Sequence, residues 1–533
     1  MLDDLKMFMR YASGLRGFLR HPLSGEECLR LIRNRLLSRQ DNFLSVLAHG
    51  IYAHAESPYL KLLNHAGVDY EVLAGWVRED GIEAALARLY DLGVYITHEE
   101  FKGHRPVQRP GLEFPVGARD FDNPRLLRQY EVRTGGSRGV GTRISIDFDF
   151  LAGEALYDYF HPLSYQAASR PMGVWMAAPP GAAGRKLVLC RAKIGKPVER
   201  WFAHEKVVLR FDTWKYFLFT NYAVHASKLF GRSLAPPEYV PLEEASKIAT
   251  WLSAKVREGT PAWLATNTSS AIRVCLAARD LGLDISGSFF RVSGEPYSAA
   301  QLALISASGG TAVPHYGMSE AAAVGRGCPN GAFPDDCHIF SDKLAVVQRD
   351  TRVGNSDLTV GALYYTTLIP SCPKLMLNVG SGDYGVLEKR ECGCLLDRMG
   401  FKTHLHAIRS FEKLTSEGMT FLGGELNILL EEVLPKRFGG QPTDYQIVEQ
   451  EEASLPQVSI VVSPRIENVV AQEIIATVIE YLSSLPGAKK MMAERWRQAD
   501  TLKVVRRNPY VTPAGKILPL HILSKGNKND NPV

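Results

Sequence analysis

The chain carries one short segment, residues 316–320 (Tyr-Gly-Met-Ser-Glu), that sets an aromatic ring, a hydroxyl and a carboxylate close together. A ring can stack on a purine, a hydroxyl can bond a phosphate oxygen, and a carboxylate can hold the Mg²⁺ that accompanies ATP. The segment lies between the apolar run 311–314 and the alanine-rich run 321–324, which predicts the end of a strand followed by the start of a helix. It is a candidate nucleotide site. The alternative is an ordinary helix start, in which Ser319 or Glu320 satisfies open backbone donors.

A glycine-rich stretch at 134–142 (Thr-Gly-Gly-Ser-Arg-Gly-Val-Gly-Thr) is the second candidate. Glycines let backbone N–H groups converge on phosphate oxygens, and the hydroxyls and the guanidinium add donors. The stretch is not a Walker A loop, because no Gly-Lys-Ser/Thr follows at the required spacing. A plain hairpin connection would favour glycine equally well.

Two further residues lie in turns. Asp383 follows the apolar run 375–379 within Gly-Ser-Gly-Asp, where a carboxylate can accept both ribose hydroxyls of a nucleotide. Lys516 follows Gly515 near the C-terminus, where a turn could deliver a positive charge to a phosphate under attack. The alternatives are a turn aspartate and a solvated turn lysine.

Cysteine and histidine gather in a third constellation, which comprises Cys328, Cys337-His338 and Cys392-Gly393-Cys394. Thiolates and imidazole suit a tetrahedral zinc ion, although the irregular spacing is not diagnostic and buried unpaired cysteines are common. His315, next to Tyr316, could meet a substrate, but packing is the favoured interpretation.

The order of these parts resembles the acyl-adenylate-forming enzymes, in particular their phenylacetate–CoA ligase-like branch. This branch includes the coenzyme F390 synthetases and, more distantly, the luciferase-linked acyl-protein synthetases. The resemblance is strongest over residues 130–434. Residues 293–298 look like the Gly-Glu-Pro element that borders the adenine. Arg409-Ser410 resembles the hinge of the mobile C-terminal domain, and Lys516 occupies the place of the adenylation lysine.

The chain also departs from the family pattern. Val140 and Gly141 stand where the family usually has Lys-Pro, and Gly380 replaces an arginine. Phe411-Glu412 stands where paired aspartates are usual. These changes predict weaker nucleotide contacts or an altered domain swing.

The resemblance implies a set of site residues. Catalytic roles fall on Lys516, Ser319 and Glu320, with Glu320 also the Mg²⁺ ligand. Nucleotide contacts are expected from Thr134, Gly135, Gly136, Ser137, Arg138, Gly139, Gly294, Glu295, Pro296, Tyr316, Gly317, Met318, Asp383 and Arg409. Some members of the branch carry structural zinc in a similar layout, which implies Cys328, His338, Cys392 and Cys394 as ligands, with Cys337 as a substitute.

The elements that must position these residues predict an α/β protein. Residues 1–105 read as a helical N-terminal segment, with a helix start at Ser24 and another helix over 82–92. Residues 106–408 alternate strands and helices, with strands expected at 144–150, 186–190 and 207–211 and helices at 242–257 and 270–281. Together these two parts form the large domain. Residues 409–533 form a small mobile α+β C-terminal domain, with helices at 426–434 and 470–485 and a strand at 457–462.

Composition narrows the function class. The 533 residues carry 62 basic and 57 acidic side chains, so a net charge of +5 offers no broad basic face for nucleic acid. No apolar run is long enough to span a membrane. The start of the chain, 1–20, is too often interrupted by charge for a secretory signal and reads as a surface helix. Eight scattered cysteines fit a reducing, cytoplasmic setting.

The leading hypothesis is ATP-dependent adenylation of a small-molecule carboxylic acid, followed by transfer to a thiol, with coenzyme A favoured. A carrier protein, a protein cysteine or an amine is the alternative acceptor. A nucleotide-binding scaffold without catalysis is the alternative from another class, suggested by the altered cradle and hinge. The identity of the acid stays open, and so does homodimerisation.

Overall fold

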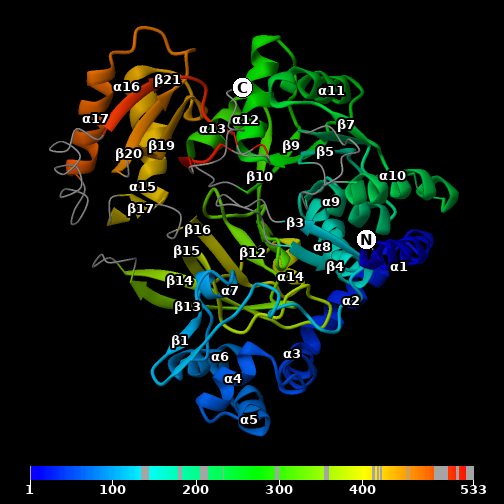
Figure 1. Ribbon diagram of the computed structural model, residues 1–533. Coiled ribbons are helices and arrows are strands. Elements are labelled where there is room, and N and C mark those ends of the chain that lie inside the picture. Colours follow the sequence, from blue (N-terminus) through cyan, green and yellow to red (C-terminus); the bar gives the residue numbers. More distant parts are fainter. Residues whose placement is uncertain are drawn as a thin grey trace.

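The computed structural model describes residues 2–133, 143–177, 183–204, 214–231, 233–294, 299–352, 359–410, 415–416, 419–420, 423–452, 455–484, 502–511, 515 and 517–523. A twelve-stranded sheet runs through the middle of the molecule, in the order β13-β14-β15-β16-β12-β11-β10-β9-β8-β5-β6-β7. Helices cover it, and a smaller sheet lies apart at the C-terminal end (Figure 1). The predicted α/β class, with a large domain and a small C-terminal one, is therefore confirmed.

The first part of the chain is helical. Its helices are α1 (Leu2–Arg20), α2 (Gly25–Leu37), α3 (Arg39–Val46), the π-helix η1 (Leu47–Tyr52), α4 (Pro58–His65), α5 (Tyr70–Asp80), α6 (Ile82–Asp91) and α7 (His98–Phe101). Ser24 starts α2 as predicted: its hydroxyl accepts from the Glu27 amide at 3.2 Å, and the Glu27 carboxylate accepts from the Ser24 amide at 2.7 Å. This reciprocal capping satisfies two of the open donors at the helix start.

One half of the large sheet is parallel. Its strands are β5 (Met172–Met176), β6 (Arg200–Ala203), β7 (Pro237–Tyr239), β8 (Trp263–Asn267), β9 (Phe289–Ser293) and β10 (Thr311–Met318). Its helices are α8 (Phe148–Ser164), α9 (Ala183–Lys193), α10 (Trp214–Leu229), the 3-10 turn η2 (Leu242–Glu244), α11 (Ala245–Arg257), α12 (Thr268–Asp280) and α13 (Ala299–Ala307). Every residue of β5 and β8 is buried, as expected for strands covered on both faces.

The other half of the sheet is antiparallel. It contains β11 (Ala322–Gly327), β12 (Cys337–Ile339), β13 (Leu344–Arg352), β14 (Thr359–Thr367), β15 (Val379–Lys389) and β16 (Thr403–Ser410), with the short helix α14 (Leu395–Arg398) before β16. The direction changes at one strand: β10 pairs in parallel with β9 and antiparallel with β11. Two small hairpins, β1 (Val107–Arg109) with β2 (Leu112–Phe114) and β3 (Tyr130–Arg133) with β4 (Arg143–Ile146), lie beside the sheet.

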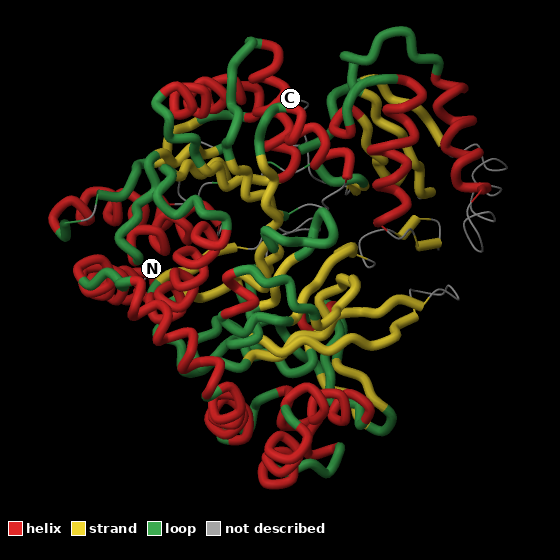
Figure 2. The backbone as a smooth tube through the Cα atoms, turned by 180° about the vertical axis from the view of Figure 1, so that it is seen from behind, coloured by secondary structure: helices red, strands yellow, loops and turns green. Residues whose placement is uncertain are grey.

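The C-terminal part has its own sheet, in the order β21-β20-β19-β22. Its elements are β17 (Thr415–Ser416), β18 (Met419–Thr420), α15 (Gly423–Ile428), the π-helix η3 (Leu429–Val433), α16 (Leu434–Phe438), the 3-10 turn η4 (Pro442–Asp444), β19 (Tyr445–Glu452), β20 (Leu455–Val462), α17 (Ala471–Ser484), β21 (Leu502–Arg506) and β22 (Leu520–Leu523). Leu430, Ile460 and Val478 belong to a core of its own. Figure 2 shows this part set apart from the large sheet in the reverse view.

Several expected elements differ from those observed. Residues 186–190, expected as a strand, lie in α9, because a short apolar run buried on all sides fits a helix as well as a strand. The strand expected at 144–150 ends at Ile146, where Asp147 caps α8 by accepting from the Phe150 amide at 2.8 Å. Residues 207–211 lie outside the described part. In the described part of the chain, no helix is long and apolar enough to cross a membrane.

Candidate nucleotide site and metal centre

Residues 316–320 form a hairpin rather than a helix start. β10 runs to Met318, a turn holds Ser319 and Glu320, and β11 begins at Ala322, which has a positive φ of 56°. The prediction of a helix was wrong because the alanine-rich run is buried along the whole of β11, where small side chains fit between the sheet and α8. Ser319 is half-buried in this turn and Gly317 is exposed.

Tyr316 and Asp383, predicted from distant parts of the sequence, lie together. The Tyr316 hydroxyl donates to Asp383 Oδ2 at 2.8 Å, and the Tyr365 hydroxyl donates to the Tyr316 oxygen at 3.2 Å. β10, β15 and β14 thus each contribute one member of this chain of hydrogen bonds. Burial, with the Asp383 carboxylate next to it, raises the pKa of Tyr316 well above its usual range. Tyr316 therefore remains a donor and fixes the orientation of the Asp383 carboxylate.

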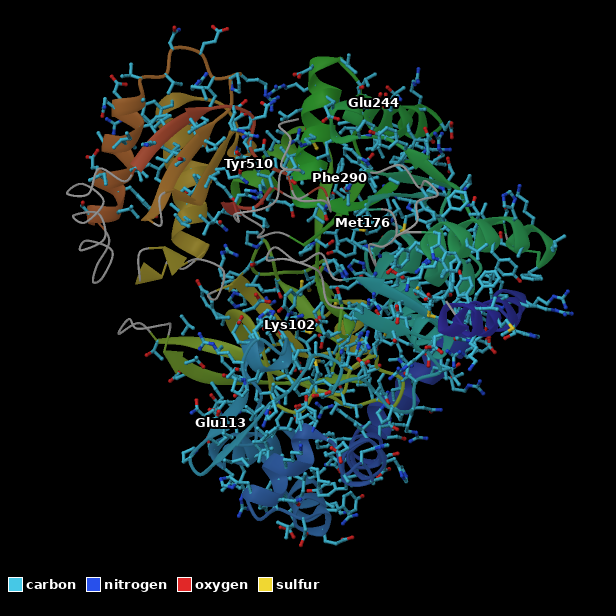
Figure 3. The ribbon with its side chains drawn as sticks, viewed as in Figure 1. Lys102, Glu113, Met176, Glu244, Phe290 and Tyr510 are labelled. Atoms are coloured by element: carbon cyan, nitrogen blue, oxygen red, sulfur yellow. The ribbon has the colours of Figure 1, made fainter. Side chains whose placement is uncertain are left out.

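Glu320 is buried and paired with a lysine that the sequence did not reveal. Lys102, directly after α7, places Nζ 2.5 Å from Glu320 Oε1, and it lies at the centre of the molecule (Figure 3). Burial alone would raise the pKa of Glu320, but the Lys102 ammonium outweighs it and the net pKa is lowered. Glu320 is therefore a carboxylate at neutral pH. Nothing in the sequence around Lys102 distinguishes it from any surface lysine.

Gly380, at the position where an arginine was expected from the resemblance, is closely surrounded. A side-chain Cβ on Gly380 would lie 3.2 Å from a ring carbon of Tyr364, which itself packs on Tyr90 and Tyr95. A long side chain here would require the aromatic group to move.

Arg409 lies at the end of β16, one register position from Asp383: Tyr384 pairs with Arg409, and Asp383 pairs with Ser410. Asp335, missed by the sequence analysis, holds the preceding segment. Its carboxylate accepts from the amides of Ala407 and Ile408, each at 3.0 Å, and lies 3.4 Å from Arg409 Nη1. Ala407 has a positive φ of 52°, so the strand is bent where Asp335 holds it.

Other predicted residues lie outside the described part of the chain. They are Thr134, Gly135, Gly136, Ser137, Arg138, Gly139, Glu295, Pro296 and Lys516. The strands on either side of residues 134–142, β3 and β4, pair antiparallel. Gly294 follows the end of β9.

The C-terminal part contacts the large domain at Gly515, the neighbour of Lys516. A Cβ added to Gly515 would lie 2.5 Å from the ring of His204.

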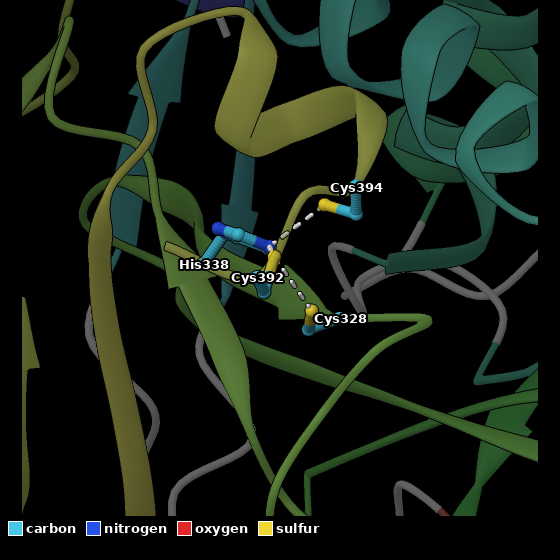
Figure 4. A group of neighbouring side chains, drawn as sticks. All are labelled: Cys328, His338, Cys392 and Cys394. Atoms are coloured by element: carbon cyan, nitrogen blue, oxygen red, sulfur yellow. Dashed lines mark hydrogen bonds between the residues drawn. The ribbon is translucent and has the colours of Figure 1, made fainter. Parts of the chain in front are cut away.

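Four of the predicted metal ligands meet at one point. The ligand atoms of Cys328, His338, Cys392 and Cys394 all lie within 4.8 Å of one another. His338 Nε2 is 3.1 Å from Cys394 Sγ and 3.5 Å from Cys392 Sγ, and the sulfurs of Cys328 and Cys392 are 3.4 Å apart. Figure 4 shows the three thiols around one end of the imidazole. Cys337, the substitute ligand, is outside this group.

This donor set fits a tetrahedral zinc ion. Ligands at ordinary zinc–sulfur and zinc–nitrogen distances would be separated by about 3.5–3.8 Å, which is close to the separations found. The other ring nitrogen, His338 Nδ1, is 2.6 Å from the Phe401 carbonyl, a contact that leaves Nε2 available to bind a metal. Hydrogen bonding from the Cys328 thiol, and from His338, lowers the pKa of Cys394 to about 3 against the effect of burial. The group therefore already favours a thiolate.

No protein-family model and no curated protein matches the chain. Solved structures that match include a 2-hydroxyisobutyryl-CoA ligase in complex with 2-HIB-AMP, which is 15% identical with a TM-score of 0.49 and matches over 95% of this chain and 91% of that one. An amide bond synthetase from Marinactinospora thermotolerans is 13% identical, with a TM-score of 0.41 over 97% and 98%. An acetoacetyl-CoA synthetase from Streptomyces lividans is 11% identical, with a TM-score of 0.39 over 76% and 55%. By name, each of these is a ligase or a synthetase. At identities of 11–15%, the similarity concerns the backbone fold alone.

Proposed function

We propose that the protein is an acyl-adenylate-forming ligase that activates a carboxylic acid with ATP and passes the acyl group to a thiol, with coenzyme A favoured. The contact that supports this most directly is the 2.8 Å hydrogen bond between Tyr316 and Asp383. It joins a ring suited to stacking on adenine to a carboxylate suited to ribose hydroxyls, although the two are distant in the sequence. The order of the other parts, from the 134–142 loop to Lys516, agrees with this assignment.

In the proposed reaction, a carboxylate oxygen of the acid attacks the α-phosphorus of ATP, and the bond between the α-phosphorus and the bridging oxygen breaks. Pyrophosphate leaves and an acyl-AMP forms. Ser319 would bond the α-phosphate, and Lys516 would stabilise the negative charge that develops during attack. The thiolate sulfur of the acceptor then attacks the acyl carbon, and AMP leaves with the electron pair of the broken bond.

Glu320 fits the role of a Mg²⁺ ligand, because it is ionised, only 7% exposed, and already faces a cation in the form of Lys102. Mg²⁺ bound here would neutralise phosphate charge. The ammonium of Lys102 would then be released from Glu320 and become available to a phosphate oxygen. Lys102 could in this way compensate for the lysine that the 134–142 loop lacks.

We also propose that Cys328, His338, Cys392 and Cys394 hold a structural zinc ion. Four protein ligands complete the coordination of zinc and leave no position for substrate, which is typical of structural sites. Such an ion would tie the start of the 328–337 loop to the segment before α14. Asp335, which contacts the hinge region at Arg409, belongs to this loop.

A pyrophosphate-release screen over carboxylic acids, with and without coenzyme A, tests the proposal. We expect release with at least one acid, and acid-dependent ATP–pyrophosphate exchange that is abolished in Lys516→Ala while the fold is retained. Exchange that is unchanged in that variant would remove Lys516 from the mechanism. Release that is independent of coenzyme A but stimulated by a carrier protein or an amine would favour the alternative acceptors. Binding of ATP with no pyrophosphate release for any acid would favour a scaffold.

A further inference from the structure

A group of buried cations lies under the sheet, on the face opposite Tyr316. Arg291 of β9 and Arg326 of β11 each place Nη1 2.7 Å from Asp158 Oδ1 of α8. Arg191 of α9 donates to the backbone carbonyl of Asp158 at 3.3 Å. These four side chains are 3–4% exposed. In Figure 3 the labelled Phe290 marks the part of β9 next to Arg291.

The positive charge of this group is not balanced. The guanidinium groups of Arg291 and Arg326 share the single carboxylate of Asp158, while that of Arg191 contacts the backbone carbonyl of Asp158. The next carboxylate on α8, Glu154, is paired with Lys343 and accepts from the Ala323 amide at 3.0 Å. Burial lowers the pKa of Arg191 and that of Arg291 to about 10, which still leaves both protonated at neutral pH. Within the part of the chain that the structure describes, an excess of two positive charges therefore remains buried.

Lys186 of α9 adds a further cation. It is half-buried, and among the described residues none lies within hydrogen-bond or ion-pair distance of its ammonium. Burial lowers its pKa, while the Glu154 carboxylate opposes that effect. A buried charge without a counter-ion is unfavourable. The excess of positive charge around Asp158 therefore indicates that an anion binds beside these side chains.

His315 connects this group to the nucleotide site. It pairs with Arg326 across β10 and β11, and Arg291 pairs with Val313 two residues earlier, so the three side chains share one face of the sheet. Burial, together with Arg326, Arg291 and Lys186, holds the pKa of His315 well below its usual range. His315 is therefore neutral and adds no charge. It immediately precedes Tyr316 in β10, so the residue next to the proposed adenine contact belongs to the face of the sheet that carries Arg291 and Arg326.

We propose that Arg191, Arg291, Arg326 and Lys186, named here the cation group, bind a carboxylate at the far end of the acid substrate, which is then a dicarboxylic acid. This inference rests on the proposed adenylation. Guanidinium groups match the geometry of a carboxylate, and a second carboxylate on the substrate would balance the excess charge. A monocarboxylic acid would leave the buried cations unpaired and be rejected for that reason.

The test compares dicarboxylic acids with monocarboxylic acids of the same chain length in pyrophosphate release. We expect kcat/KM for at least one diacid to exceed that of its matched monoacid by about tenfold or more. Lys186→Met should remove most of this preference by lowering kcat/KM for the diacid, because one of the cations that binds the second carboxylate is lost. Lys186→Arg should keep the preference. Lys228→Met, which removes an exposed lysine of α10, should change neither rate.

Thermal unfolding without nucleotide separates this inference from the proposed function. A diacid should raise the Tm of the wild-type protein and not that of Lys186→Met. If no acid releases pyrophosphate but a diacid still raises Tm in a Lys186-dependent manner, the binding site is supported and the adenylation proposal fails. Equal rates for monoacids and diacids would overturn the inference and leave adenylation intact. A Lys186-dependent rise in Tm with inorganic phosphate, without preference for diacids, would also overturn it, because the site would then serve a free anion.

Discussion

The two faces of the β10–β11 hairpin differ in how completely their polar groups are paired. On one face, Tyr316 bonds Asp383 and Tyr365, and in the adjoining turn Glu320 pairs with Lys102. On the other, around Arg326, two guanidinium groups share one carboxylate. A fully paired face is stable and positioned before any ligand arrives. A face with excess charge is stabilised by a ligand, so the same hairpin presents a preformed site and a site that depends on its ligand.

The largest effect is expected from removing the one anion of the charged face. Asp158→Asn would leave Arg291 and Arg326 unpaired in the core, and the free energy of unfolding should fall by about 3–5 kcal/mol in chemical denaturation. Asp149→Asn, at an exposed position on the same helix, should change it by less than about 0.5 kcal/mol. An Asp158→Asn protein as stable as the wild type would mean that the cations do not depend on this carboxylate.

The metal centre, which begins directly after β11, offers the next largest effect. With free Zn²⁺ at about a hundred times its Kd, a chelator should lower the free energy of unfolding by about 3 kcal/mol. Cys394→Ser should lose zinc as measured by metal analysis, whereas Cys337→Ala should retain it, because the Cys337 sulfur lies outside the group. Purified protein that neither contains nor binds zinc would refute the assignment.

The ion pair of Glu320 and Lys102 tests the paired face by pH. Because both side chains retain some exposure, Glu320→Gln should lower the free energy of unfolding by about 2 kcal/mol at neutral pH. The folded-state pKa of Glu320 lies below its ordinary value of 4.5, so the stabilisation is complete above that value and is lost as the pH falls through the lowered pKa. The difference between wild type and variant should therefore disappear in acid. A difference independent of pH would show that the pair contributes through packing alone.

The smallest effect concerns the Tyr316 hydroxyl. Tyr316→Phe removes a hydrogen bond to a carboxylate and should cost about 1.5 kcal/mol of unfolding free energy. It should also raise KM for ATP, because Asp383 loses the donor that orients it. Tyr365→Phe, which removes only the outer member of the chain, should have a smaller effect on both. If the two variants behaved alike, Asp383 would not owe its orientation to Tyr316.

Much of the fold could be predicted from the sequence, because local signals agree with the final structure in many elements. The cap at Ser24 and the helical spacing over 82–92 are examples. The helix over 186–190 could not be identified, because an apolar run buried on every side shows no periodicity. The hairpin after Tyr316 was missed because alanine favours helices, whereas packing against α8 decided the outcome.

The candidate site was predictable only in part. Tyr316 and Asp383 were recognisable because each lies in a distinctive short motif, and the structure brings them together. Lys102 and Asp335 were not, because their roles depend on contacts with residues 218 and 74 positions away, respectively. The charge excess around Arg326 was equally hidden, since it arises from side chains on separate strands and helices.

The metal centre also has a consequence for the unfolded chain. Cys328 and Cys392 are 64 positions apart, and β12 to β15 lie between them. If zinc remained bound to Cys328 and Cys392 in the unfolded chain, it would act as a cross-link that closes a loop of this length. The conformational entropy of the unfolded chain would then fall by an amount equivalent to about 4 kcal/mol. Early zinc binding during folding would keep the ends of the antiparallel half together. Strands distant in sequence would then search a smaller volume for their partners, and refolding of this half should be faster with zinc present than without it.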